Sequence, residues 1–289
     1  VQTISTAFFF FLRVTHVELP KKVKVIAHQF LIECDLFDSD IVLPETVTTI
    51  GDNFLSNCSS FSHSVTILSP SYTIVGQFLS YCPMFDSALD LSGATSIGSA
   101  LLMGAETFNS AITLSNTVNF NTANFLDDAH LFNQPLTFPD SVTTIGASCM
   151  VRCTSFNQPL DLSNITSIGT YFLSECTSYN QPIDFNGAAI GSYALSECSS
   201  FNSAVTGLGV SVGAYFLNHC ASFNQPIDFS VVTTSLGAPN FLGWESFNYP
   251  LTFNVELPVS SMMFSNCHAM VSPITLNVAP SNSSASVNS

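Results

Sequence analysis

A single motif recurs through this chain at intervals of 22 to 24 residues, and each copy carries a large apolar residue at the same point. Periods of this length are typical of solenoids, in which each repeat buries its apolar face only against its neighbours. The period therefore predicts one repeat solenoid of about eleven coils with one parallel β-sheet. The recurring apolar residues, called anchors below, are Phe37, Phe61, Phe85, Phe108, Phe132, Phe156, Tyr179, Phe201, Phe223, Phe247 and Met270.

The copy that begins at the anchor Phe132 illustrates the expected local structure. An alternating segment, Leu136 to Phe138, predicts a short strand with two residues facing the core. A second extended segment runs from Val142 to Gly146, and a glycine there indicates either positive φ or close backbone approach. A helical or 3₁₀ turn should then carry Met150 and Cys153 inward. Stacking of the alternating strands would form the parallel sheet.

The middle position of the alternating strand holds Thr or Asp, which should form the outer face of the sheet. Four of these positions are acidic: Asp90, Asp161, Asp184 and Asp228. Carboxylates stacked about 5 Å apart repel one another, and calcium prefers several oxygen ligands. Both a solvated acidic face and a calcium-binding ladder therefore stay open.

The charge of the chain limits its partners. The net charge is −15, so nucleic acid is excluded as an expected partner, because phosphate binding needs Lys and Arg. Only Arg152 is basic after Lys24. A transmembrane helix is not expected, since no run approaches the roughly 20 apolar residues that a spanning helix needs.

Eight of the nine cysteines lie three residues before an anchor, while Ala105 and Ala129 take that position in two copies and Trp244 takes it in a third. Because alanine neither ligates metal nor forms disulfides, the pattern predicts a ladder of small buried thiols. An odd count argues against a complete disulfide framework. The close pair Cys149 and Cys153 lacks further ligands, so we expect no metal site.

Four copies contain the sequence Phe/Tyr-Asn-Gln-Pro, at residues 132–135, 156–159, 179–182 and 223–226. Over about residues 17–278 the chain resembles the BspA-like leucine-rich repeat. The resemblance implies a leucine-rich-repeat-like solenoid and a surface-exposed or secreted protein used for adhesion and interaction. It brings no catalytic residue and no cofactor, and no nucleophile or nucleotide-binding motif occurs in the chain. We therefore expect a non-enzymatic protein.

The chain ends suggest three regions: an N-terminal aromatic cap or docking segment (1–16), the solenoid (17–278) and a Ser/Asn-rich linker tail (279–289). A solenoid without polar caps exposes two different apolar ends, which favours head-to-tail filaments of identical copies. The alternative is a monomeric cell-surface adhesin that binds a host protein, a matrix protein or a glycan. The residues expected to make the end-to-end contact are Phe8, Phe9, Phe10 and Phe11 at one end and Val271, Ile274 and Leu276 at the other.

Two further kinds of residue were considered as sites. Asn-x-Ser/Thr sequences make Asn57, Asn164 and Asn282 candidate N-glycosylation positions in an extracellular protein. The histidines fall at different points of the repeat, so we expect them to lie on the surface without a paired ligand.

Overall fold

The computed structural model describes residues 2–7, 13–237, 240–254 and 264–277. The chain divides into two compact units, Val1–Val142 with Cys149–Phe156, and Thr143–Ser148 with Asn157–Ser289. Each unit is a parallel β-solenoid, and the described residues contain no helix. The predicted leucine-rich-repeat-like solenoid of parallel strands is confirmed.

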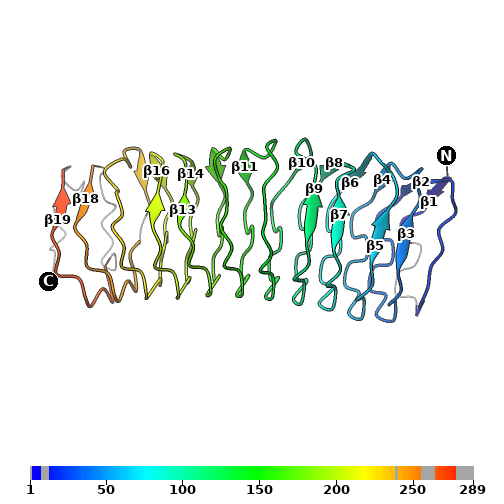
Figure 1. Ribbon diagram of the computed structural model, residues 1–289, viewed down its shortest axis with the longest axis horizontal. Coiled ribbons are helices and arrows are strands. Elements are labelled where there is room, and N and C mark those ends of the chain that lie inside the picture. The colour runs from blue at the N-terminus through cyan, green and yellow to red at the C-terminus, as the bar shows by residue number, and fades with distance from the viewer. Residues whose placement is uncertain (1, 8–12, 238–239, 255–263, 278–289) are drawn as a thin grey trace. The chain divides into compact units, whose positions relative to one another are not determined.

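The first unit contains one long row of strands and two strand pairs (Figure 1). The long row is a six-stranded sheet in the order β1, β2, β4, β6, β8, β10, and the pairs are β3 with β5 and β7 with β9. The strands are β1 (Gln2–Ile4), β2 (Val23–Ile26), β3 (Ile41–Leu43), β4 (Thr49–Ile50), β5 (Val65–Ile67), β6 (Tyr72–Ile74), β7 (Leu89–Leu91), β8 (Ala94–Ile97), β9 (Ile112–Leu114) and β10 (Asn119–Phe120).

The second unit repeats this arrangement. Its long row is a five-stranded sheet in the order β11, β12, β14, β16, β17, and its pairs are β13 with β15 and β18 with β19. The strands are β11 (Thr144–Ile145), β12 (Ser167–Ile168), β13 (Ile183–Asp184), β14 (Ala189–Ile190), β15 (Val205–Thr206), β16 (Ser211–Val212), β17 (Ser235–Leu236), β18 (Leu251–Phe253) and β19 (Ile274–Leu276).

The position of the main sheet corrects the sequence prediction of one parallel sheet built from the alternating Leu-x-Leu strands. Those strands form only pairs, and the long rows come from the second extended segment, which ends at the recurring glycine. In three copies the alternating segment forms no strand at all: residues 136–138, 160–162 and 227–229.

The recurring glycine allows close backbone approach between successive coils. A Cβ placed on Gly169 would lie 2.7 Å from the carbonyl carbon of Gly146, and Gly169 does not have positive φ. Of the two interpretations of this glycine, close approach is therefore the one the structure supports. Any side chain there would separate the backbones that the long row brings together.

The turn that follows the glycine is not helical, which corrects the second local prediction. Every second residue has left-handed backbone: Asn53, Leu55 and Asn57 have φ of 58°, 53° and 57°. The N–H of Leu55 donates to the carbonyl of Phe30 in the preceding coil, and that of Asn57 donates to the carbonyl of Ser80 in the following coil. Each left-handed residue costs about 1–2 kcal/mol, which hydrogen bonds to both neighbouring coils help to offset.

The anchors form stacked aromatic rows in the core of each unit. In the first unit neighbouring rings from Phe37 to Phe156 lie 5.6–5.9 Å apart, and in the second unit the row from Tyr179 to Phe247 has spacings of 5.8–5.9 Å. Offset stacking of this kind adds about 0.5–1.5 kcal/mol per pair to the gain from burial.

The cysteine ladder has a hydrogen-bonding role that the sequence did not reveal. Cys58 Sγ donates to the carbonyl of Leu31 at 2.9 Å, in the left-handed turn of the preceding coil. Trp244, at the same position of its repeat, donates from Nε1 to the carbonyl of Leu217 at 2.7 Å. The position three residues before an anchor therefore favours a side chain that can donate a hydrogen bond to the preceding coil. Eight cysteines are buried and Cys267 is half-buried, so burial of the ladder is confirmed, and burial raises the pKa of the Cys198 and Cys220 thiols.

The Asn-Gln-Pro motif connects one coil to the next. The side-chain Oδ1 of Asn202 accepts the backbone N–H of Asn224 at 2.8 Å, and Asn224 in turn accepts the N–H of Asn248 at 3.0 Å. Gln225 Nε2 also donates to Asn202 Oδ1, at 3.3 Å. The motif thus satisfies backbone donors between coils, which gives a structural reason for its recurrence.

Candidate functional site: the open terminal strand and the surface ladders

The last described strand, β19, exposes the side chains that its position in the repeat would otherwise bury. Ile274 and Leu276 are 41% and 46% exposed and Val271 is 86% exposed, whereas Leu251 and Phe253 of β18 are 0% exposed. β19 pairs in parallel with β18 on one side, with Ile274 opposite Leu251. The described residues place no strand on its other side. Phe8 to Phe11, the other half of the expected contact, lie outside the described residues.

A segment near the other end of the chain has the same pattern and was missed by sequence reasoning. Residues 17–19, Val-Glu-Leu before a proline, precede β3 by one period of 24 residues. Val17 and Leu19 are half-buried and Glu18 is exposed, and the segment forms no strand. The signal that could have found it is its match to Ile41–Leu43, which is also followed by a proline.

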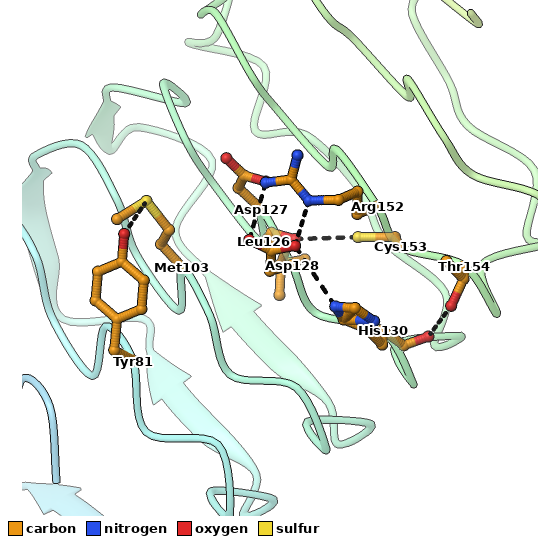
Figure 2. A network of polar contacts seen from close by, with 9 residues as sticks. All are labelled: Tyr81, Met103, Leu126, Asp127, Asp128, His130, Arg152, Cys153 and Thr154. Carbon is orange, nitrogen blue, oxygen red and sulfur yellow. Dashed lines mark hydrogen bonds and ion pairs between the residues drawn. The ribbon is translucent and has the colours of Figure 1, made fainter. Parts of the chain in front are cut away.

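A cluster of charged side chains surrounds Arg152 in the first unit (Figure 2). Its Nη2 donates to Asp127 Oδ1 and to Asp128 Oδ2, both at 2.9 Å, and its Nε donates to Asp128 Oδ1. His130 Nε2 lies 3.5 Å from Asp128 Oδ1, and Thr154 Oγ1 donates to the carbonyl of His130. The guanidinium bridges two adjacent carboxylates of the preceding coil and so cross-links the two coils.

The acidic strand positions act as turn formers. Oδ1 of each accepts the backbone N–H two residues further on, at 2.8–2.9 Å, in Asp90, Asp161, Asp184 and Asp228. This hydrogen bond from Ser163 holds the pKa of Asp161 below its ordinary value. In the part of the chain that the structure describes, no three His, Cys, Asp or Glu side chains converge as metal ligands. The calcium hypothesis therefore gains no support from this geometry.

Three histidines face carboxylates, contrary to the expectation that they lack a nearby ligand, and the first is His16, whose Nε2 lies 3.6 Å from Glu18 Oε1. His63 Nδ1 lies 3.5 Å from Asp40 Oδ1 and its Nε2 lies 3.9 Å from Asp38 Oδ1; His130 is paired with Asp128 as described above. All of these side chains are at least partly exposed.

Three tyrosines form a stack on the surface of the second unit. The rings of Tyr171 and Tyr193 lie 4.6 Å apart and those of Tyr193 and Tyr215 lie 4.4 Å apart, each pair within 9° of parallel. Tyr171 is 41% exposed. The sequence carried this signal as a tyrosine recurring every 22 residues, where earlier copies have Asn124 or Ser148.

The candidate glycosylation residues Asn57 and Asn164 are exposed, and Asn282 lies outside the described residues. Exposure is required for modification, and both positions stay predictions.

Comparison with known proteins identifies the repeat. The family model of the BspA type leucine rich repeat region matches residues 2–131, 95–224 and 129–249. The chain belongs to this family. A search of the curated proteins found no significant match. A solved structure of a leucine rich cell surface protein from Faecalibacterium prausnitzii A2-165 is similar over 96% of this chain and 87% of that one, with 18% identity and a TM-score of 0.46. No helix among the described residues is long and apolar enough to cross a bilayer.

Proposed function

We propose that this chain is a non-enzymatic repeat protein of the cell surface or extracellular space, and that its copies associate head to tail. The observation that carries the proposal is the exposure of Ile274 and Leu276, because the same strand position is fully buried in β18. Family membership supports the repeat architecture, and the resemblance stated above supports the surface location.

In the proposed contact, β19 of one copy pairs with residues 17–19 of the next. The pairing of β3 with β5, which joins Ile41 to Val65 and Val42 to Thr66, supplies the expected register. By that register Ile274 lies opposite Val17, Thr275 opposite Glu18 and Leu276 opposite Leu19. The contact joins two different surfaces, so it is heterologous and extends into a filament unless it closes into a ring.

The energetics are compatible with reversible association. Full burial of an Ile, Leu or Val side chain contributes about 1.5–3 kcal/mol, and Val271, Ile274 and Leu276 retain much of their exposed area. Their burial offsets part of an association cost of about 4–15 kcal/mol. Backbone hydrogen bonds along the open edge of β19 supply a further contribution.

Sedimentation velocity over a range of protein concentrations tests this proposal. We expect the unchanged chain to form larger species as concentration rises and Leu276→Lys to remain a monomer, because a charge at the contact opposes its burial. The matched control is Leu68→Lys, since Leu68 is exposed to a similar extent, 51%. The control should associate like the unchanged chain. An unchanged chain that stays monomeric throughout would overturn the proposal.

A monomeric binding module is the second candidate function, as an adhesin for a host protein, a matrix protein or a glycan. The stack of Tyr171, which is exposed, with the half-buried Tyr193 and Tyr215 favours it, because aromatic residues are enriched at binding surfaces.

A further inference from the structure

One coil of the second unit lacks the aromatic residue that its neighbours place after the alternating strand. β13 and β15 pair with Ile183 opposite Val205 and Asp184 opposite Thr206. This register puts Gly207 beside Phe185, and the next coil has Phe229 at the same position. Gly207 has a φ of +63°, which a phenylalanine would rarely adopt. Phe185 and Phe229 are both 0% exposed, so the core of this coil lacks one ring and Gly207 brings the backbone of its turn there instead.

A recess lies at this place, with a volume of about 550 Å³. That volume is in the range of pockets that hold small ligands or short peptide segments. The residues of its wall that bear on binding are Gly207, Asp228, Val231, Tyr249 and Pro250.

The charge of the recess is of one sign. Among the described residues that line it, Asp228 is the one ionisable acid or base apart from the phenol of Tyr249. Its Oδ1 accepts the N–H of Ser230 at 2.8 Å, which orients the carboxylate. Asp228 is exposed, and Tyr249 and Val231 are 37% and 44% exposed, so all three are accessible to a ligand.

The geometry points to a binding site for an arginine side chain of a basic polypeptide. The guanidinium would donate to the carboxylate of Asp228 and stack against the ring of Tyr249, two contacts that suit its planar, charged group. Its aliphatic stem would cover Val231 and Pro250. The net charge of −15 also favours a basic partner and repels phosphate-bearing ligands. The inference does not rest on the head-to-tail contact, although Thr252 in the wall of the recess pairs with Thr275 of β19.

Fluorescence anisotropy with a labelled Gly/Ser peptide that carries one central arginine tests the site. The measurements use the Leu276→Lys chain, and begin with a check that it is monodisperse, so that self-association does not affect the signal. A peptide with citrulline in place of arginine keeps the shape and hydrogen-bonding groups but removes the charge. We expect the citrulline peptide to bind about tenfold more weakly.

Asp228→Asn is the decisive variant, because the amide oxygen can still accept the N–H of Ser230 while the charge is lost. The matched control is Asp161→Asn, which has the same turn hydrogen bond, from Ser163, and is not part of the recess. Asp228→Asn should weaken arginine-peptide binding about tenfold, Tyr249→Leu about fivefold, and Asp161→Asn not at all. An equal loss of affinity for the arginine peptide in Asp228→Asn and Asp161→Asn would overturn the inference. Three other results would also overturn it: undiminished binding of the citrulline peptide, saturable binding of a neutral oligosaccharide in place of the arginine peptide, or no binding of the arginine peptide.

Discussion

Strands β18 and β19 have nearly the same sequence, Leu-Thr-Phe and Ile-Thr-Leu, and the same position in the repeat. The first and last residues of β18 are fully buried, while those of β19 are 41% and 46% exposed. The difference comes from what lies beside each strand and not from its residues. An apolar strand position in a solenoid therefore indicates a surface that a neighbouring coil normally covers. At β19, no neighbouring coil among the described residues does so.

The largest expected effect is on the free energy of unfolding, which should depend far more on a buried anchor than on a residue of β19. Phe201→Ala removes a fully buried ring that stacks between Tyr179 and Phe223, and should lower the free energy of unfolding by about 3–5 kcal/mol. Leu276→Ala, measured at a concentration where the chain is monomeric, should cost less than about 1 kcal/mol because the side chain is half-exposed. Urea denaturation followed by circular dichroism measures both. Similar losses would mean that β19 is covered within one copy.

A smaller effect on stability is expected at the position three residues before the anchor, where some coils have a buried hydrogen-bond donor and others have alanine. Trp244→Phe keeps an aromatic side chain but removes the N–H that bonds to the carbonyl of Leu217, so we expect a loss of about 1–3 kcal/mol. Ala105→Cys should act in the opposite direction by adding a donor at an equivalent position, with a gain of about 0.5–1 kcal/mol. Thermal denaturation of both variants checks the signs. A neutral Trp244→Phe substitution would show that the donor contributes nothing.

The smallest effect is the dependence of stability on pH, which should differ between a coil of the first unit that contains Asp38 and a coil of the second unit that contains Asn202. Hydrogen bonds from Ser62 and from Ser64 hold the pKa values of Asp38 and Asp40 below their ordinary value of 3.8. Such groups stabilise the fold above that pH, and the contribution is lost as the pH falls through the lowered values. In the second unit Asn202 accepts the corresponding backbone bond without a charge.

Acidification below about pH 4 should therefore loosen the coil that contains Asp38 before the coil that contains Asn202. Hydrogen exchange measured by mass spectrometry at several acidic pH values resolves the two segments. Replacing Asp38 by Asn should remove the difference between them. Earlier loosening around Asn202 would contradict this explanation.

The sequence predicted the features that depend on the repeat. The period and the alternating segments were enough to predict a solenoid of parallel strands, and alanine at positions 105 and 129 was enough to predict that the thiols pack in the core. Features that depend on backbone direction were not predictable in this way. Many left-handed residues of the turn, such as Leu55, are neither glycine nor asparagine, and hydrogen bonds to the neighbouring coils, such as the bond from Leu55 to Phe30, hold their conformation.

The candidate sites were predicted less completely than the fold, for a related reason. Val271, Ile274 and Leu276 were selected because the last repeat keeps the ordinary apolar strand pattern, and the structure shows all three exposed. The match between β19 and residues 17–19 becomes apparent only when strand register is known. The recess at Gly207 likewise depends on which residues the register places side by side, since the sequence alone shows only an irregular copy.

Chemical cross-linking between copies tests the head-to-tail register most directly. Thr275→Cys and Glu18→Cys chains, both with the half-buried Cys267 replaced by Ala, are mixed and treated with a short thiol-reactive bifunctional reagent, which should react with these exposed positions in preference to the eight buried native cysteines. We predict a covalent dimer in this mixture and none when Thr252→Cys, one coil further in, replaces Thr275→Cys. A dimer that forms equally well with Thr252→Cys, or no dimer in either mixture at concentrations where the chain associates, would contradict the pairing of β19 with residues 17–19.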